Sequence, residues 1–262
     1  MRNLQFALDT SFFTVFVAFL AGAFFLYLER DRVPEQYKLA VRVSCVYLTI
    51  AAINYFYMKD YYEAGNTWFP TSFRYVDWIL TTPLMLLKFP LILGLGPRGR
   101  KFMIRLVVLD FVMIATGFLG EVSASPGMHY GMFLAGCVAW FAIMFMLITA
   151  LTDLPDRINT ATRKTVRVMT GFLILGWAIY PAGYMIPLLG TPFEVRELLY
   201  NVGDLVNKLG LTLTIYVGAK QTMLEREFEA EEEEEEEYQE QPEDDYLGER
   251  PLLEEELFPS MS

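Results

Sequence analysis

The chain has 262 residues, of which 54% are hydrophobic and 15% aromatic, and its formal net charge at pH 7 is −11. This composition fits a membrane domain with several spanning segments better than a soluble domain. The charge is unevenly divided, because 18 acidic and two basic residues follow from Glu225 onward. The rest of the chain is therefore net positive, and only that part is expected to form a packed fold.

Apolar segments long enough to cross a bilayer as helices recur along the first 220 residues. They lie at about 10–28, 37–58, 73–93, 102–119, 128–151, 168–189 and 197–219. The sequence therefore predicts an all-α membrane protein with a seven-transmembrane-helix bundle over residues 1–220. Residues 221–262, which include seven consecutive glutamates, are expected to form a disordered acidic tail.

The connections between the predicted spans are short and contain glycine or proline. Residues 94–97 and 190–192 are clear turns of this kind. The connection over 59–70 is longer and contains Gly65-Asn66, so a small hairpin outside the membrane fits there. Residues 1–10 lack the basic region and the cleavage site of a signal peptide, so we expect the first span to be retained.

Positively charged residues are concentrated on one side of the predicted bundle. The connections after the first, third and fifth spans contain Arg30, Arg32, Arg98, Arg100, Lys101, Arg157, Arg163, Lys164 and Arg167. The other side holds few, chiefly Lys59 and Arg196. Because cytoplasmic connections are enriched in lysine and arginine, we expect the N-terminus outside and the C-terminus in the cytoplasm.

Two charged residues interrupt the last predicted span. Asp204 and Lys208 are four residues apart, so they lie on one face of a helix, about one turn from each other. Charges inside a membrane span are costly and usually mark a functional site. One interpretation is a buried ion pair that holds helices together. The other is a desolvated lysine that forms a Schiff base with a carbonyl compound, with the carboxylate as its counter-ion.

The third predicted span has a polar face. Arg74, Asp77, Thr81 and Lys88 are spaced by three, four and seven residues, which places all four on one side of a helix. Asp77 and Lys88 would be about 16 Å apart along the helix axis at 1.5 Å per residue. Such a face is a polar track through a bilayer, although a purely structural role stays open.

Aromatic residues on the third and sixth predicted spans are candidates for a ligand pocket. Trp177 and Tyr180 precede Pro181, which would bend the sixth helix there. Aromatic residues at helical spacing most often belong to the packed core. Together with Trp78 on the third span, however, they are able to enclose a long flat apolar ligand.

Four segments resemble the corresponding motifs of the microbial (type 1) rhodopsins. They are Arg74-Tyr75-Val76-Asp77-Trp78, Thr81-Thr82-Pro83, Trp177-Ala178-Ile179-Tyr180-Pro181 and Asp204-Leu205-Val206-Asn207-Lys208. Residues 54–58 and 136–140 are most similar to the proteorhodopsin and xanthorhodopsin side of the family. The resemblance covers all seven predicted helices and ends at the tail.

This resemblance implies a retinal protein. All-trans retinal would be bound to Lys208 as a protonated Schiff base, with Asp77 and Asp204 as counter-ions. Asp77 would be the primary proton acceptor, supported by Thr81. Arg74 would gate the path towards the extracellular side.

The resemblance also implies roles for residues around the chromophore. Tyr55 would hydrogen-bond near Asp204, and Met85 occupies a position that tunes colour. Asp110 on the fourth span either bonds across to the third span or is a satisfied buried acid. The residues expected to line the retinal are Trp78, Trp177, Tyr180 and Tyr200.

Lys88 departs from the common pattern of the family. Related proton pumps usually carry Asp or Glu at this cytoplasmic donor position, and a minority resemble this chain in having lysine. An apolar setting disfavours the charged amine, so that a lysine there is able to store and release a proton near neutral pH. Alternatively, Lys88 extends to the cytoplasmic interface and donates no proton.

A second departure concerns the surroundings of Asp77. Proteorhodopsin-like pumps often place a histidine beside this carboxylate, and the matching residue here is Asn54. His129, near the start of the fifth span, is expected at the interface. Glu194 and Glu197 are candidates for proton release, but solvated loop carboxylates are the favoured interpretation.

The function implied by the resemblance is light-driven outward proton pumping. Light would isomerise the retinal, Asp77 would accept the proton, and the Schiff base would be reprotonated from the cytoplasmic side. The sodium pumps of the family carry Asn-Asp-Gln where this chain has Asp77, Thr81 and Lys88, and its chloride pumps lack a carboxylate at the first position. Neither ion is therefore expected.

Two rival functions stay open. A photosensor with a slow photocycle would suit the missing carboxylic donor and the long tail, and a seven-helix protein without retinal would use Asp204 and Lys208 only structurally. In either case we expect a multi-pass protein of the cell membrane, not an enzyme, in contact with lipids and not with nucleic acid. Relatives suggest a homo-oligomer, a trimer or pentamer, and a carotenoid antenna is an open possibility.

Overall fold

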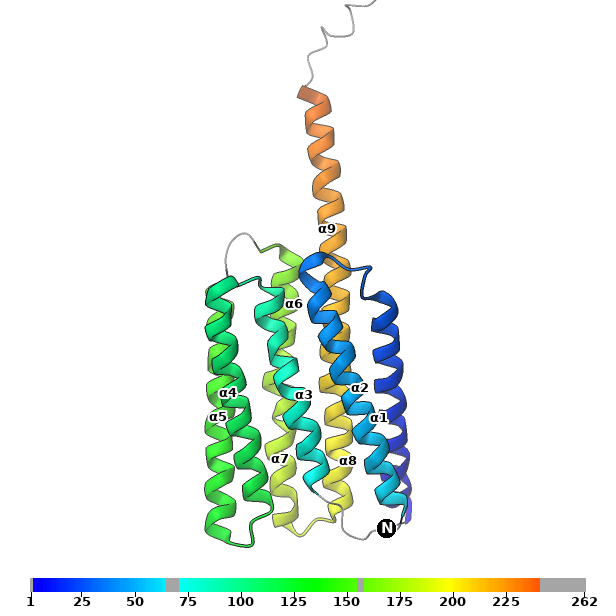
Figure 1. The fold of residues 1–262 in the computed structure, drawn as a ribbon, viewed down its shortest axis with the longest axis vertical. Coiled ribbons are helices and arrows are strands. Elements are labelled where there is room, and N and C mark those ends of the chain that lie inside the picture. The colour runs from blue at the N-terminus through cyan, green and yellow to red at the C-terminus, as the bar shows by residue number, and fades with distance from the viewer. Residues whose placement is uncertain (1, 65–70, 155–157, 241–262) are drawn as a thin grey trace, which may run out of the picture. The chain divides into compact units, whose positions relative to one another are not determined.

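The computed structural model describes residues 2–64, 71–154 and 158–240, apart from the side chains of residues 2, 97, 98, 237, 239 and 240. Throughout these ranges the regular structure is helical (Figure 1). The chain divides into two units, Met1–Met223 and Leu224–Ser262. The possible hairpin at Gly65-Asn66 lies outside the described residues.

Five uninterrupted helices form the first part of the larger unit. They are α1 (Arg2–Glu29), α2 (Glu35–Glu63), α3 (Thr71–Ile92), α4 (Gly96–Glu121) and α5 (Pro126–Thr152). Four of them contain the whole of one predicted span and extend beyond it at one end or both, because the helices continue past the apolar part of the sequence; α3 begins two residues before its span and ends one residue short of it. The predicted seven-helix order is confirmed over this part of the chain.

The sixth and seventh helical segments are divided by irregular turns. The sixth consists of α6 (Thr160–Gly171), the π-helical turn η1 (Phe172–Gly176), α7 (Ile179–Met185) and the 3₁₀ turn η2 (Ile186–Leu189). The seventh consists of α8 (Phe193–Asp204), the π-helical turn η3 (Leu205–Gly210) and α9 (Leu211–Glu240). The two π-helical turns fall beside or include predicted site residues, Trp177 after η1 and Lys208 within η3, and π-turns inside helices are frequent at functional sites.

The helices of the larger unit lie side by side in a bundle (Figure 1). Successive helices from α1 to α5 are neighbours, and both α1 and α7 pack against α8. Gly94, Gly96 and Gly190 have positive φ angles of 57°, 55° and 71°, which lets the chain reverse after α3 and after η2. Both turns predicted at these positions are confirmed.

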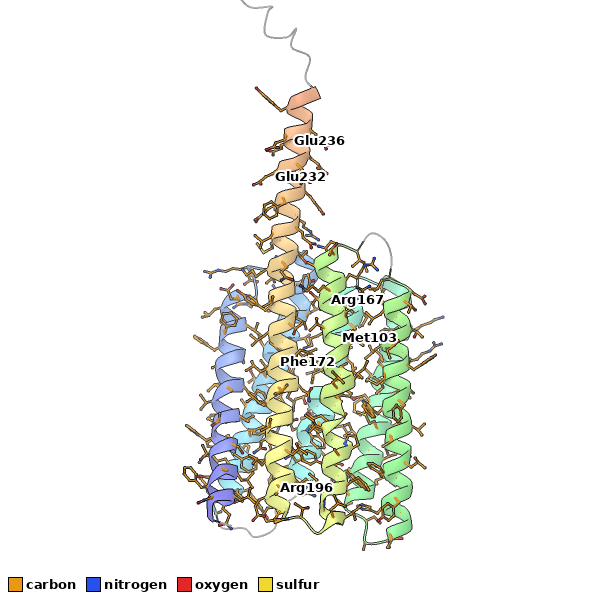
Figure 2. All side chains as sticks on the ribbon, turned by 180° about the vertical axis from the view of Figure 1, so that it is seen from behind. Met103, Arg167, Phe172, Arg196, Glu232 and Glu236 are labelled. Carbon is orange, nitrogen blue, oxygen red and sulfur yellow. The ribbon has the colours of Figure 1, made fainter. Side chains whose placement is uncertain are left out.

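The distribution of side chains suits a membrane. Large apolar side chains such as Phe24, Leu134 and Phe145 are more than 60% exposed on the outside of the bundle, whereas charged residues lie in its interior. Arg167 and Arg196 lie at opposite ends of the bundle (Figure 2). Six helical segments of the described chain are long and apolar enough to cross a membrane. The seventh is not among them, which fits the polar residues Asp204 and Lys208 within it.

The beginning of the acidic tail differs from the expectation. We expected disorder from residue 221 onward, but α9 continues to Glu240, and its side chains from 231 to 236 are exposed. Glutamate is a good helix former, and extending an existing helix costs less free energy than starting one. The remaining tail residues, 241–262, lie outside the described part of the chain.

Close packing of α9 against α6 gives a stability prediction. A Cβ atom at Gly218 would overlap the side chain of Thr165, whereas one at Gly131 on α5 would meet no atom within 4 Å. Gly218→Ala should therefore lower the free energy of unfolding by about 1–3 kcal/mol, as overpacking of a filled site does. Gly131→Ala should leave it unchanged or raise it slightly. Denaturation in detergent micelles measures both, and equal stability of the two variants would contradict the packing.

Candidate functional site

A lysine amine lies between two carboxylates in the interior of the bundle. Lys208 Nζ is 2.6 Å from Asp77 Oδ2 and 3.0 Å from Asp204 Oδ2, and all three side chains are at most 1% exposed. Lys208 belongs to η3, Asp204 ends α8, and Asp77 comes from α3. The structure thus joins the polar residues of the third and seventh spans, which the sequence identified separately, into one cluster.

The two carboxylates have different surroundings. Asp204 accepts hydrogen bonds from Tyr180 Oη at 2.6 Å, Tyr55 Oη at 2.9 Å and Trp78 Nε1 at 3.2 Å. Asp77 Oδ1, in contrast, has no hydrogen-bond partner among the described residues. Donors to a carboxylate stabilise its anionic form, and an unsatisfied oxygen is available to a proton. The geometry therefore distinguishes Asp204, which accepts from three donors besides the Lys208 amine, from Asp77, which has one oxygen without a partner among the described residues.

Thr81 lies beside this cluster but bonds to backbone. Its hydroxyl donates to the carbonyl oxygen of Asp77 at 2.8 Å, one helical turn earlier, and so the contact that the structure gives it is not with the Asp77 carboxylate. Asn54, at the position where relatives often have histidine, donates to the carbonyl of Ile50 at 3.0 Å. His129, at the start of α5, is partly buried, with Nδ1 2.9 Å from the carbonyl oxygen of Gly120.

The two π-helical turns meet beside Lys208. Asn207 Nδ2 in η3 donates to the carbonyl oxygen of Gly176 in η1 at 2.9 Å. A Cβ atom on Gly176 would overlap the Asn207 amide, so a glycine is needed for this close approach. Sequence reasoning did not single out Gly176 or assign Asn207 a role, because the period of a single helix gives no sign of a π-turn.

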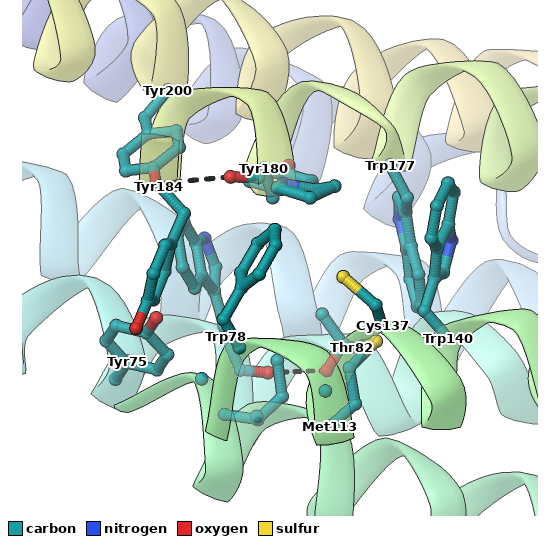
Figure 3. Close-up of a pocket in the computed structure, with 15 residues that line it drawn as sticks. Tyr75, Trp78, Thr82, Met113, Cys137, Trp140, Trp177, Tyr180, Tyr184 and Tyr200 are labelled. Carbon is teal, nitrogen blue, oxygen red and sulfur yellow. Dashed lines mark hydrogen bonds between the residues drawn. The ribbon is translucent and has the colours of Figure 1, made fainter. Parts of the chain in front are cut away.

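The bundle also contains an aromatic pocket (Figure 3). Trp78 and Tyr180 belong to both the pocket and the Lys208 cluster, since their polar atoms bond Asp204 while their rings line the pocket. The lining comes from α3, α4, α5, the sixth segment and α8. Its residues are Tyr75, Trp78, Thr82, Met113, Ile114, Gly117, Phe133, Gly136, Cys137, Trp140, Trp177, Tyr180, Pro181, Tyr184 and Tyr200.

The pocket contains four of the residues predicted to bind the ligand, namely Trp78, Trp177, Tyr180 and Tyr200. Two other candidates lie elsewhere: Tyr55 bonds Asp204, and Met85 is buried on the same face of α3 as Trp78. The walls are mostly aromatic and apolar, and they include two glycines, Gly117 and Gly136. These features suit a flat apolar group.

Asp110 bonds across to the third helix. Its Oδ2 accepts a hydrogen bond from Thr82 Oγ1 at 2.8 Å, and its side chain is buried. Of the two alternatives that the sequence left open, the bond between α4 and α3 is therefore confirmed. Thr82 also lines the pocket, so this bond fixes one of its walls.

An ionic network extends from Arg74 to the end of the bundle at which α3 and α8 begin, called here the N-terminal end. Arg74 donates to Tyr55 Oη at 2.7 Å and pairs with Glu197 at 2.9 Å. Arg196 then bridges Glu197 and Glu121, each at 2.7 Å. The expectation that Glu197 is a solvated loop carboxylate is wrong, because two arginines from different helices surround it and its side chain is 1% exposed.

Lys88 lies on the opposite side of the Lys208–Asp77–Asp204 cluster from Arg74. Its Nζ donates to Tyr47 Oη at 3.0 Å and contacts Ser44 Oγ at 3.5 Å. The side chain is fully buried. The alternative in which Lys88 extends its amine to the interface is therefore wrong. Tyr47, on α2, was not recognised from the sequence.

Comparison with known proteins places the chain in one family. The family model described as bacteriorhodopsin-like protein matches residues 6–221. The green-light absorbing proteorhodopsin of Gamma-proteobacterium EBAC31A08 is 35% identical over 216 residues, which cover 79% of this chain and 84% of that protein.

Solved structures agree with this placement. The rhodopsin of Exiguobacterium sibiricum is 36% identical, with a TM-score of 0.76, and the match covers 83% of this chain and 97% of that one. Xanthorhodopsin, described as a light-driven ion pump with dual chromophore, is 26% identical, with a TM-score of 0.79. That match covers 86% of this chain and 96% of xanthorhodopsin.

The ionic network predicts a difference between two glutamates of α8. Glu197→Gln removes the negative charge that Arg74 and Arg196 share, and breaking a buried pair typically costs about 3 kcal/mol of unfolding free energy or more. Glu194→Gln, at a half-buried position in the first turn of the same helix, should cost much less. Denaturation in detergent compares them, and similar losses would argue against the network.

Proposed function

The chain belongs to the bacteriorhodopsin-like family of multi-pass membrane proteins, and from this membership we propose that it is a light-driven outward proton pump. The family implies a retinal chromophore. The observation that carries the proposal is the Lys208 amine held between Asp77 and Asp204, with Asp204 bonded to Trp78 and Tyr180, which line an aromatic pocket.

We propose that Lys208 Nζ holds all-trans retinal as a protonated Schiff base. Trp78, Trp177, Tyr180 and Tyr200 would then pack against the chain and ring of the ligand, and the buried Met85 would influence its colour. When bound, retinal would supply a light-driven isomerisation that lowers the proton affinity of the attached nitrogen and reorients it. Everything else in the cycle depends on the protein's own groups.

Asp77 is the proposed proton acceptor. Its Oδ2 lies 2.6 Å from Lys208 Nζ and its Oδ1 has no partner among the described residues, so a proton can move directly between them. Asp204, with three donors besides the amine, would stay charged as the second counter-ion. Thr81 would act on Asp77 only indirectly, through its backbone carbonyl.

The proposed release path leads from Asp77 towards the N-terminal end of the bundle, which we assign to the outside of the cell. Arg74 is the first group of this path. It would gate the path because it bonds Glu197 and also Tyr55, which in turn donates a hydrogen bond to Asp204. Arg196 and Glu121 extend the same network. Lys88, on the opposite side, would return a proton to Lys208 from the cytoplasmic side.

The photosensor alternative differs in net transport. A slow photocycle, a coloured protein and no light-driven change of external pH would favour it.

A carotenoid antenna and a trimeric or pentameric assembly are further proposals from the family. Added carotenoid should then sensitise the pigment at its own absorption bands, and the mass of the detergent-solubilised protein would give the number of subunits.

Light-driven pH changes test the pump. Unbuffered cells that express the chain with retinal should acidify the medium under green light, and a protonophore should abolish the effect. Lys208→Ala should give no pigment, because the amine that forms the linkage is missing, and Lys88→Ala should slow recovery after a flash. A pigment whose illumination leaves external pH unchanged would contradict the pump.

The assignment of the acceptor predicts unequal effects of two buried aspartates. Asp77→Asn should keep the pigment but lower outward transport by about a hundredfold or more, the low end of what a positioned proton-transfer group contributes. Asp110→Asn is the control, because Asp110 is also buried but bonds Thr82. Full transport in Asp77→Asn, measured per bound chromophore, would exclude Asp77 as the acceptor.

A further inference from the structure

A buried tyrosine on α2 connects the two lysines of the bundle interior. Tyr47 Oη is 3.0 Å from Lys88 Nζ and 2.8 Å from the backbone carbonyl oxygen of Lys208. It also shares a hydrogen bond with Thr212 Oγ1. The side chain is completely buried. One hydroxyl thus contacts both the proposed proton donor and the residue that would carry the chromophore.

The bonding capacity of this hydroxyl is filled by these contacts. A phenol donates one hydrogen bond and accepts others. Because an ammonium can only donate and a carbonyl can only accept, Tyr47 accepts from Lys88 and donates to Lys208 O, which leaves Thr212 as a second donor. The direction of the whole chain, from the Lys88 amine to the Lys208 backbone, is therefore fixed by the groups themselves.

Tyr47 is the main polar partner of Lys88. The Lys88 Nζ lies 4.4 Å from the centroid of the Tyr47 ring, within the range of a cation–π contact. Within the described part of the chain, the amine's other hydrogen bond is the longer one to Ser44 at 3.5 Å. None of the ion pairs found among the described residues includes Lys88. The position of this amine therefore depends on the ring and hydroxyl of Tyr47.

The other end of the connection lies in an irregular stretch of backbone. Lys208 is part of the π-helical turn η3, where the regular α-helical hydrogen bonds are interrupted. Because the Lys208 amine and this carbonyl belong to the same residue, a displacement of the side chain is able to shift the carbonyl. Any such shift moves the acceptor of the Tyr47 hydroxyl and, through it, the Lys88 amine.

We propose that Tyr47 is a positioning residue that couples Lys88 to Lys208. It holds the Lys88 amine and ties it to the backbone of the chromophore-bearing residue. In the return step, which rests on the proposed function, an N–H bond at Lys88 breaks and one at Lys208 Nζ forms. Lys88 is left neutral until it takes a proton from the cytoplasmic side, and Tyr47 ends the step unchanged.

The contact itself is tested without any transport assay. In full-length protein in lipid bilayers in the dark, the ¹⁵Nζ resonance of Lys88 should shift in Tyr47→Phe, which keeps the ring but loses the hydroxyl. Tyr37→Phe is the matched control, because Tyr37 is equally buried on the same helix but bonds Thr162 at 3.0 Å. An identical Lys88 resonance in Tyr47→Phe and the wild type would overturn the proposal.

The coupling is tested by the kinetics after a flash. In Tyr47→Phe, recovery of the resting absorption should be about tenfold slower, the size expected when one hydrogen bond to a charged group is lost, and its rate should follow the proton concentration of the medium as in Lys88→Ala. The double variant should be no slower than Lys88→Ala, because residues that act as one unit are not additive. Tyr37→Phe should recover like the wild type.

The outcomes separate this inference from the proposed function. Slower recovery in Tyr47→Phe with an unchanged pH profile, adding to the effect of Lys88→Ala, would reduce Tyr47 to a packing residue and overturn the coupling. A wild type that pumps while Tyr47→Phe behaves like Tyr37→Phe would overturn the inference alone. A wild type without light-driven transport would reject the pump, and the dark resonance would still decide the contact.

Discussion

A buried amine needs negative charge beside it, and this requirement organises the interior of the bundle. An isolated ammonium in an apolar medium is very costly, and a nearby carboxylate removes much of that cost. Lys208 has two, and one of them, Asp204, is stabilised by further hydrogen bonds. The hydroxyls of Tyr55 and Tyr180 serve Asp204, and Tyr55 in turn accepts from Arg74. These polar contacts thus form one connected set around the Lys208 nitrogen.

The side chains on the two sides of the Lys208 nitrogen are of different kinds. Towards the N-terminal end, Arg74, Glu197, Arg196 and Glu121 form alternating charges in direct contact. On the other side, Lys88 meets only hydroxyls in the hydrogen bonds that the structure gives it. Alternating charges form a stable, extended network, whereas a lone amine among hydroxyls is able to change its protonation without breaking an ion pair.

Relations within one helix were predictable from the sequence, and relations between helices mostly were not. The spacing of Asp204 and Lys208 is enough to place them on one face, and the resemblance to a family pairs them with Asp77. Glu197 looked solvated because its partner Arg74 is 123 residues away in the chain. Tyr47 was missed for the same reason, since an aromatic residue in an apolar span indicates only packing until its neighbours are known. The helical start of the acidic tail was missed because charge repulsion was weighed above helix propensity.

The short distance between Lys208 and Asp77 has an electrical consequence. In the proposed cycle, a proton that moves from the amine to the carboxylate converts an ion pair into two neutral groups, and the net charge of the pair stays the same. The nitrogen and oxygen atoms are 2.6 Å apart, so the proton moves less than a tenth of a hydrocarbon layer of roughly 30 Å. Membrane potential, which acts in proportion to the distance that a charge travels across the bilayer, therefore weighs little on this step. Its main effect falls on the longer proton movements through Lys88 and past Arg74.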